Sequence, residues 1–321
     1  NNFSIAHYSN NLKKNDFLSQ QEITYKRCNY KKKIDENILS KKIYKLKKNV
    51  KTNYPVRNID LQKMKIGAII ISRSDSSRLK NKAFLKIGDF TSIEHCIKNT
   101  KKMKYLDEVI LATTNLNIDK RYRKYSNKMS VKIFFGDPIN VVERCYLAAK
   151  KNNLDIIIRI TGDCPFISEE ILEELLLNHL NTKSDFTVAN KFPVGASGEV
   201  ISFKALERLY FYLKKQKDFK YTEYPSFYFK YNPKLFKYNV CKINSKYQKN
   251  FRLTLDYKDD LKMLRLLYYK MKKLKMDNNI DNTIKVIEKY KNISKINSHI
   301  KLVYKSKNFI KKMIKIVKIT Q

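Results

Sequence analysis

Strand-like and helix-like segments alternate along most of this sequence, and the alternation begins at Lys65. Short apolar runs rich in β-branched residues are typical of buried strands. They occupy residues 65–72, 108–114, 131–136, 155–161 and 185–190. The stretches between them repeat apolar residues at positions i, i+3, i+4 and i+7, which is the pattern of a helix packed on a sheet. This alternation predicts an α/β fold with a mostly parallel sheet.

A polar loop follows the first apolar run, at residues 72–82. In doubly wound sheets, ligands bind beyond the carboxyl ends of the strands, so this loop is a candidate for function. Its arginines, lysines and hydroxyl groups suit a polyphosphate, because cations neutralise phosphate charge while hydroxyl and backbone N–H groups bind phosphate oxygens. The loop has neither the Walker pattern G-x-x-x-x-G-K-[ST] nor the dinucleotide pattern G-x-G-x-x-G. A solvated basic loop without a ligand is the alternative.

Two acidic turns follow apolar runs further along the chain. Asp163 lies in the phrase TGDCP, at the end of the run 155–161, and Asp256 lies in LTLD, just past what we expect to be another short apolar strand. Carboxylate oxygens are ligands of Mg²⁺. Two such side chains facing one cationic loop would suit a metal-assisted nucleotidyl transfer. Each aspartate, taken alone, is also a plausible N-cap of the helix that follows it.

The charge balance suggests a second class of function. Lysine and arginine total 68 against 30 acidic residues, a formal net charge of +38. Such a balance is typical of proteins that bind nucleic acid or another polyanion. The excess is mostly lysine and is spread through every segment, whereas a functional basic patch is more often concentrated and rich in arginine. We therefore expect no specific nucleic-acid partner, and keep polyanion binding as an alternative.

Cysteine use and hydropathy bear on the cellular compartment. The cysteines are scattered and form no C-x-x-C pair, which fits reduced thiols. No run is long enough for a membrane-spanning helix, so we expect a cytoplasmic protein without a transmembrane segment. Residues 305–321 form a basic tail with apolar residues at helical spacing. This tail is either a helix with a solvated lysine face or a helix lying on an anionic membrane surface.

Several blocks carry a family resemblance, among them GAIIISRSDSSRLKNKAFLKIGD, IFFGDPINVVERCYLAAKK, RITGDCP and FRLTLDYKDD. In order and spacing they resemble the cytidylyltransferase family of the spore-coat polysaccharide biosynthesis type, over about residues 65–303. That family is related to the enzymes that activate acylneuraminate and KDO as CMP-sugars. The resemblance implies the nucleotide-diphosphosugar-transferase variant of the Rossmann-like fold. It also implies a homo-oligomeric enzyme of cell-surface polysaccharide or glycan biosynthesis that joins a sugar acid, expected to be a nonulosonic acid, to CTP with release of pyrophosphate.

The resemblance implies roles position by position. The expected nucleotide-binding residues are Arg73, Ser76, Ser77, Arg78, Lys82, Ala112, Thr113 and Arg144. Of these, Arg73, Arg78 and Lys82 are the cations expected to assist catalysis. Asp163 and Asp256 would hold Mg²⁺, the expected cofactor. Asn190 and Glu199 are the expected contacts of the substrate sugar, in pockets that Arg144 would also line.

The sequence departs from the family pattern at several places. Asp75 stands where the family usually has Gly, and an acid inside a phosphate-binding loop opposes the anion that the loop should bind. Further departures are Lys80 and Asn81 for Pro-Gly, Asn140 and Ser197 for Asp, and Tyr224 for His. These changes leave a third alternative open, a catalytically degenerate scaffold that binds a sugar nucleotide.

The amino-terminal residues 1–63 lack the strand–helix rhythm and read as short strands and turns with a helix near residues 36–42. The phrases KKNDFL and EITYKR, together with YPVRNIDL, which resembles a partial repeat, are similar to the SAF, or antifreeze-like, domain of sialic-acid synthases. We thus expect a SAF-like, β-clip module at 1–63, a cytidylyltransferase domain at 64–304 and the tail at 305–321. The module is short and begins at Asn1, so a truncated module, fused to or associated with a nonulosonate synthase, is a further expectation.

Overall fold

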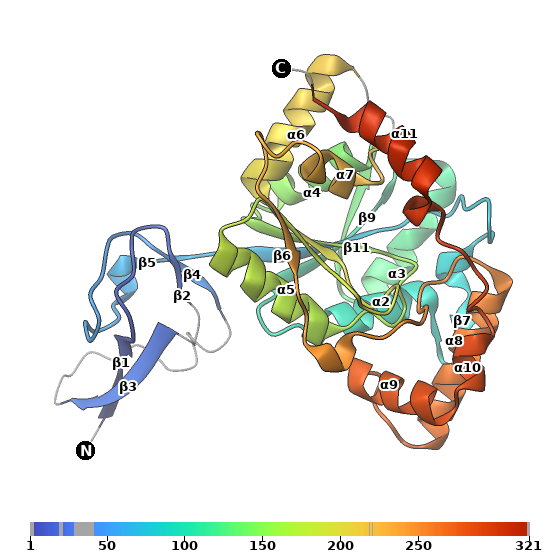
Figure 1. The fold of residues 1–321 in the computed structure, drawn as a ribbon, viewed down its shortest axis with the longest axis horizontal. Coiled ribbons are helices and arrows are strands. Elements are labelled where there is room, and N and C mark those ends of the chain that lie inside the picture. Colours follow the sequence, from blue (N-terminus) through green and yellow to red (C-terminus); the bar gives the residue numbers. More distant parts are fainter. Residues whose placement is uncertain (1–2, 19–21, 29–41, 218, 220, 320–321) are drawn as a thin grey trace. The chain divides into compact units, whose positions relative to one another are not determined.

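The structure is a computed structural model that describes residues 3–18, 22–28, 42–217, 219 and 221–319. The chain divides into two compact units (Figure 1). The small unit comprises residues 1–66 with 104–107, and the large unit comprises residues 67–103 with 108–321. No helix in these described ranges is both long and apolar enough to cross a membrane.

The small unit consists of short antiparallel strands. Strands β1 (Phe3–Tyr8) and β3 (Ile23–Cys28) form one pair, and β2 (Phe17–Leu18), β4 (Tyr44–Leu46) and β5 (Leu61–Lys63) form a three-stranded sheet. Its core gathers Tyr8, Leu18, Leu46, Val56 and Leu61. The predicted helix at residues 36–42 lies, except for its last residue, outside the described residues. The likeness of this unit to an antifreeze-like domain stays a prediction.

A seven-stranded sheet forms the centre of the large unit, in the order β10-β9-β6-β11-β13-β12-β14. The pairs β10–β9, β9–β6 and β12–β14 are parallel, whereas β13 is antiparallel to both of its neighbours. The strands are β6 (Ile66–Ile71), β9 (Glu108–Thr114), β10 (Lys132–Gly136), β11 (Ile156–Thr161), β12 (Phe186–Ala189), β13 (Glu199–Ser202) and β14 (Tyr238–Cys241). The mostly parallel α/β sheet predicted from the sequence is therefore confirmed.

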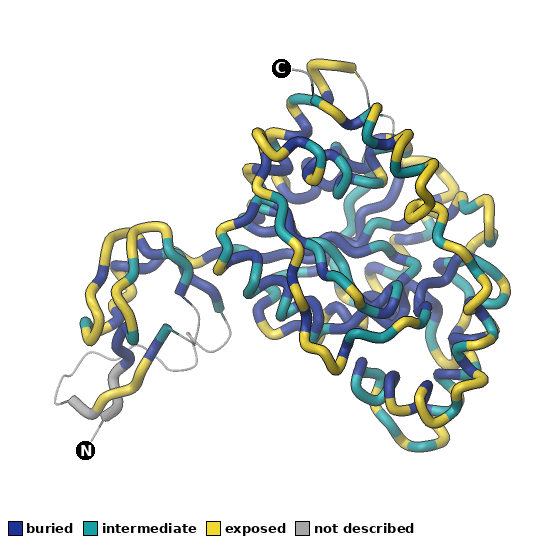
Figure 2. Tube along the Cα trace, viewed as in Figure 1, coloured by how far each residue is buried: buried dark blue, intermediate teal, exposed yellow. Residues whose placement is uncertain are grey.

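Helices cover both faces of this sheet (Figure 1). Apolar side chains of α4, α6, α7 and α11 form one core cluster with strand residues such as Ile69, Ile110 and Phe186. Figure 1 shows α2 and α5 on the other side of the sheet. These helices are α2 (Ser92–Thr100), α4 (Val141–Lys151), α5 (Glu169–Thr182), α6 (Phe203–Gln216), α7 (Pro225–Lys230) and α11 (Lys307–Val317). Figure 2 shows that the sheet is the most continuously buried part of the unit.

The remaining elements lie around the edges of the sheet. A short hairpin joins β7 (Lys86–Ile87) and β8 (Phe90–Thr91), and a 3₁₀ helix, η3 (Lys82–Phe84), precedes it. Helix α3 (Tyr122–Lys128) packs against β10. Helices α8 (Lys258–Lys273), α9 (Ile280–Lys289) and α10 (Asn292–Lys295) pack on one another.

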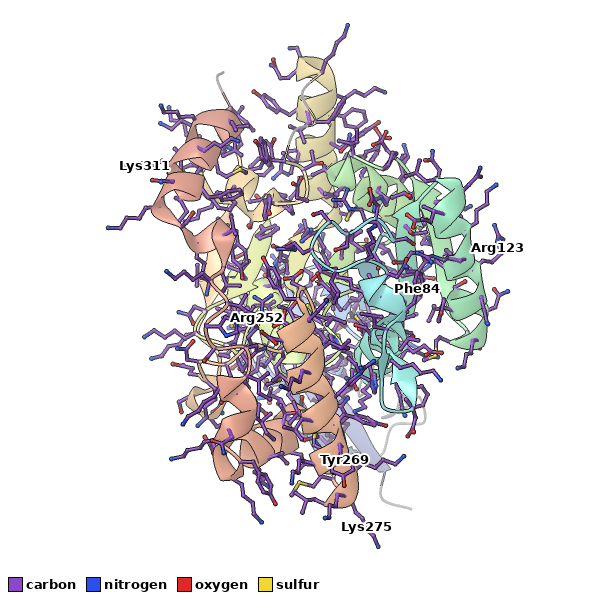
Figure 3. The ribbon with its side chains drawn as sticks, turned by 90° about the vertical axis from the view of Figure 1, so that its right-hand side faces the viewer. Phe84, Arg123, Arg252, Tyr269, Lys275 and Lys311 are labelled. Carbon is purple, nitrogen blue, oxygen red and sulfur yellow. The ribbon has the colours of Figure 1, made fainter. Side chains whose placement is uncertain are left out.

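The basic tail contains helix α11. Met313 and Val317 are buried in the core cluster of the large unit, while Lys311, Lys312 and Lys315 are exposed. In Figure 3, Lys311 points outward from this helix. The protein itself thus covers the apolar face that a membrane-surface helix would have to expose.

Candidate active site

Two carboxylates and one lysine meet at the carboxyl end of β11. Lys82, the first residue of η3, donates from Nζ to Oδ2 of Asp163 at 2.5 Å and to Oδ1 of Asp256 at 2.7 Å. The backbone also joins the two acidic turns, because Leu255 N–H donates to the carbonyl oxygen of Asp163 at 2.8 Å. Residues far apart in the sequence therefore share one ammonium group.

Charge attraction keeps Lys82 and Asp163 ionised. Burial by itself would raise the pKa of Asp163, but the Lys82 ammonium and its hydrogen bond outweigh burial and lower that pKa to about 2. Burial alone would lower the pKa of Lys82, yet the two carboxylates raise it overall. Both partners consequently carry their charges at neutral pH.

The cationic loop lies beside these carboxylates. A guanidinium nitrogen of Arg78 donates to Oδ1 of Asp256 at 2.7 Å, and the guanidinium lies 5.7 Å from the centre of the Tyr257 ring. The side chain of Arg78 is 48% exposed, Arg73 and Ser77 are exposed, and Ser76 is half-buried. The loop thus combines two cations, Arg78 and Lys82, which contact Asp256, with an exposed cation, Arg73, that solvent or a ligand can reach.

A second set of contacts fixes the backbone of the loop. The hydroxyl groups of Ser72 and Tyr122 lie 2.7 Å apart, and Ser74 N–H donates to Oδ1 of Asp119 at 2.8 Å. Arg121 donates to Oγ of Ser74 at 3.1 Å. Tyr122, Asp119 and Arg121 were not predicted from the sequence. Asp119 lies just after the predicted strand 108–114, so its position beyond a carboxyl end is the signal that could have found it.

The other predicted nucleotide-binding residues lie under or beside the loop. The carbonyl oxygen of Ala112 accepts from Ser72 N–H at 3.1 Å, which places β9 against the start of the loop. Thr113 is fully buried, and its Oγ1 has no hydrogen-bond partner within the described part of the chain. Arg144, which is 1% exposed, donates to the carbonyl oxygens of Asp137 at 3.0 Å and Pro138 at 3.2 Å. Its guanidinium therefore braces the turn after β10, and burial lowers its pKa.

The two predicted sugar contacts lie at neighbouring strands. Glu199, at the start of β13, accepts from Arg159 at 2.7 Å, and Arg159 also donates to the carbonyl oxygen of Glu223 at 2.9 Å. Asn190 directly follows β12, and its Oδ1 is buried without a hydrogen-bond partner among the residues described. Arg159 was not singled out from the sequence, because its position inside a strand carries no functional signal.

The residues present fit a divalent cation that takes part of its ligands from a bound phosphate. The described residues contain no group of three or more His, Cys, Asp or Glu side chains that could hold a metal ion by themselves. Mg²⁺ is often bound through one or two carboxylates together with substrate phosphates and water. Asp163 and Asp256 supply two such carboxylates around one shared positive charge.

The sheet, the cationic loop after its first strand and the paired carboxylates define an α/β protein of the nucleotidyltransferase class. Residues 67–312 match the cytidylyltransferase family, and the chain belongs to this family. The match starts at residue 67, so it does not extend to the antifreeze-like resemblance of residues 1–63.

Among curated relatives, the uncharacterized protein MJ1063 of Methanocaldococcus jannaschii is 34% identical over 239 residues, covering 74% of this chain and 96% of the relative. The spore coat polysaccharide biosynthesis protein SpsF of Bacillus subtilis is 25% identical over 207 residues, covering 63% of this chain and 85% of that protein. A 3-deoxy-manno-octulosonate cytidylyltransferase of Leptospira interrogans is 31% identical over 109 residues, or 34% of this chain and 44% of the relative.

Among solved structures, a cytidylyltransferase from Leptospira borgpetersenii superposes with a TM-score of 0.65 at 27% identity. The superposition covers 74% of this chain and 99% of the other. The predicted resemblance to the spore-coat and KDO cytidylyltransferases is confirmed at the level of the family.

Proposed function

We propose that the chain transfers the cytidylyl group of CTP to the anomeric hydroxyl of a sugar acid, giving a CMP-sugar and pyrophosphate. The observation that carries the proposal is the shared contact of Asp163 and Asp256 with Lys82, beside a cationic loop at the carboxyl ends of the strands. Membership of the cytidylyltransferase family supports CTP as the nucleotide. A relative named 3-deoxy-manno-octulosonate cytidylyltransferase supports a sugar acid as the acceptor.

The loop residues would bind the triphosphate. Arg73, Arg78 and Lys82 would neutralise its negative charge, and the hydroxyls of Ser76 and Ser77 would donate to its oxygens. The sugar hydroxyl attacks the α-phosphorus in line and gives up its proton to solvent. A P–O bond forms, and the bond to pyrophosphate breaks. The same three cations offset the charge that develops on the leaving group.

Asp163 and Asp256 would hold Mg²⁺ through their carboxylate oxygens, which are ligands that Mg²⁺ accepts. Mg²⁺, when bound, would neutralise and orient the phosphates. Lys82 would then release at least one carboxylate and turn its ammonium toward the phosphates. Its two hydrogen bonds hold both carboxylates beside the loop for this exchange.

Glu199 and Asn190 would bind the acceptor. Arg159 holds one carboxylate oxygen of Glu199, which leaves the second oxygen for a sugar hydroxyl. The buried Oδ1 of Asn190 requires a donor, and a sugar hydroxyl or the amino group of cytosine would satisfy it. The resemblance of residues 1–63 to a domain of sialic-acid synthases favours a nonulosonic acid within this class.

Pyrophosphate release tests the proposal. The purified full chain is incubated with CTP, MgCl₂ and, separately, KDO or sialic, legionaminic or pseudaminic acid. We expect release with at least one acid and a loss of about 100-fold or more in Asp163→Asn, because a group that binds the metal or phosphates in the transition state is removed. Asp259→Asn is the matched control, since Asp259 is 50% exposed on its side chain and pairs with His299 instead. CTP binding by calorimetry without turnover would instead favour a nucleotide-binding scaffold.

A further inference from the structure

A buried polar cluster lies behind the carboxylate of Asp256. Its members are Arg252, Asp260 and Asn297, which are 6%, 0% and 1% exposed. They come from the segment before Asp256, from the first turn of α8 and from the segment after α10. Figure 3 shows Arg252 in the interior of the large unit, away from outward-pointing residues such as Lys311. The nucleotide and metal assignments above use none of the three.

Asp260 is the fixed point of the cluster. Its Oδ1 accepts from Nε of Arg252 at 2.8 Å and from Nδ2 of Asn297 at 2.9 Å. Its Oδ2 accepts from Arg252 at 3.2 Å and from the backbone N–H groups of Asp256 at 2.9 Å and Tyr257 at 3.0 Å. A carboxylate with this many donors has no freedom to rotate, so it fixes the plane of the Arg252 guanidinium.

Arg252, held in this way, in turn orients the carboxylate of Asp256. One guanidinium nitrogen of Arg252 donates to Oδ2 of Asp256 at 2.7 Å. The other oxygen of Asp256, Oδ1, accepts from Lys82 and Arg78, each at 2.7 Å. The two oxygens therefore have different surroundings: Oδ2 is held from the interior, and Oδ1 faces the loop and the carboxylate of Asp163.

We propose that Arg252 is a positioning residue, held by Asp260 and Asn297, that fixes Asp256 so that Oδ1 faces the cation site. The proposal rests on the proposed function, because it assigns Asp256 to the metal. Hydrogen bonds to a metal-binding carboxylate from outside the coordination sphere orient it, and their loss typically weakens metal binding by about 10–100-fold. The cluster thus sets metal affinity without contacting metal, nucleotide or sugar.

A buried ion pair with a purely structural role is the competing explanation. Removing one partner of such a pair lowers stability whatever its function, so a fall in melting temperature does not distinguish the two. The distinguishing quantity is the affinity for the metal, measured separately from the affinity for the nucleotide.

The experiment compares wild type, Arg252→Met and Arg252→Lys as full chains. The dissociation constant of Mn²⁺ is measured by electron paramagnetic resonance with a CTP analogue that carries a methylene group between the α- and β-phosphorus. The dissociation constant of the same analogue is measured by calorimetry without metal. Arg265→Met is the matched control. Arg265 is an exposed arginine of α8, and it donates to the carbonyl oxygen of Lys86 and not to Asp256 or Asp260.

We expect Arg252→Met to raise the Mn²⁺ dissociation constant by about 10-fold or more, with analogue affinity unchanged within about twofold. The Mn²⁺ dissociation constant of Arg252→Lys should lie between those of Arg252→Met and wild type, because lysine keeps the charge and loses the bidentate geometry. A folded Arg252→Met protein with wild-type Mn²⁺ affinity would overturn the inference, as would an equal loss of metal and metal-free analogue binding. If Arg252→Met does not fold, the isosteric Asp260→Asn decides by the same two measurements. A wild-type protein that binds neither CTP nor Mn²⁺ contradicts the proposed function itself, which separates the two failures.

Discussion

The ammonium group of Lys82 lies 2.5 Å from Oδ2 of Asp163, and this contact joins the cationic loop to the turn after β11. The side chains are 13% and 20% exposed, so the charges interact in a partly dehydrated environment where attraction is stronger than in water. Asp256 shares the same ammonium group. Lys82 is thus the cation that contacts both carboxylates.

Replacing Lys82 with methionine should make the melting temperature of the protein depend more strongly on Mg²⁺. The substitution leaves two close carboxylates without their shared cation, and we expect a loss of about 2 kcal/mol in the free energy of unfolding. MgCl₂ should then raise the melting temperature of Lys82→Met more than that of wild type, because a bound cation stabilises the folded state. Lys80→Met, an exposed change in the same loop, is the control. An equal Mg²⁺ effect in all three proteins contradicts the prediction.

The buried His179 should make stability depend on pH between about 6.5 and 4. Burial lowers its pKa from 6.5 to about 4, and its ring nitrogens lie 2.9 Å from Oγ1 of Thr187 and 3.0 Å from Oγ of Ser202. The unfolded chain therefore binds a proton in this window that the folded chain does not. The stabilisation is complete above pH 6.5 and is lost as the pH falls to 4, by up to about 3 kcal/mol.

Urea unfolding at a series of pH values measures this dependence. His179→Gln should flatten the slope between pH 6.5 and 4 relative to wild type, because glutamine does not titrate there. His299→Gln is the control, since the side chain of His299 is 65% exposed. Parallel slopes for wild type and His179→Gln would show that His179 is not the titrating group.

Gly162 permits the close approach of the turn after β11 to the cationic loop. A Cβ atom at this position would lie 2.7 Å from Cβ and 2.8 Å from Oγ of Ser72. We expect Gly162→Ala to destabilise the protein by about 1–3 kcal/mol, and to reduce activity because Asp163 is the next residue. The variant Ser72→Gly removes the two closest atoms, although it also loses the contact with the Tyr122 hydroxyl. Gly162→Ala should therefore lower the melting temperature less in a Ser72→Gly background than in wild type. An equal fall in both backgrounds would mean that the contact with Ser72 is not the cause.

Asn140 caps helix α4. Its Oδ1 accepts from Glu143 N–H at 3.0 Å, which satisfies one of the free donors at the start of the helix. Asn140→Ala should therefore lower the free energy of unfolding by about 1 kcal/mol, while Asn140→Asp should leave it nearly unchanged. Chemical denaturation of the two variants tests the prediction, and equal losses in both would contradict it.

The elements that could be predicted from the sequence are those with a strong local pattern. The apolar runs 108–114 and 155–161 correspond to β9 and β11, because a β-branched run buried on both faces is recognisable without its neighbours. The antiparallel strand β13 and the edge strand β14 were not predicted as strands of this sheet. Each is four residues long, and its place in the sheet depends on partners remote in sequence.

The candidate site divides in the same way. Asp163 and Asp256 were predicted to face the loop because each was expected to follow a strand of the sheet. Asp163 does follow β11, whereas residues 253–255 before Asp256 form no strand. The hydrogen bond from Leu255 N–H to the carbonyl oxygen of Asp163 joins the second acidic turn to the first instead. The position of Arg144 could not be predicted in detail: its guanidinium binds backbone carbonyls of the turn after β10. The Arg252–Asp260–Asn297 cluster could not be predicted either, since these polar residues have no distinctive spacing in the sequence. They contact one another only because α8 and the segment after α10 bury them together.

The sequence alone determined the alternating fold and which loops lie at the functional edge, since hydrophobic periodicity is a local property that survives without tertiary contacts. Only the tertiary structure decided which charges meet there. Lys82 pairs with Asp163 and Asp256, and Arg252 holds the far oxygen of Asp256, because burial makes an unpaired charge costly and folding brings partners from distant segments to satisfy it.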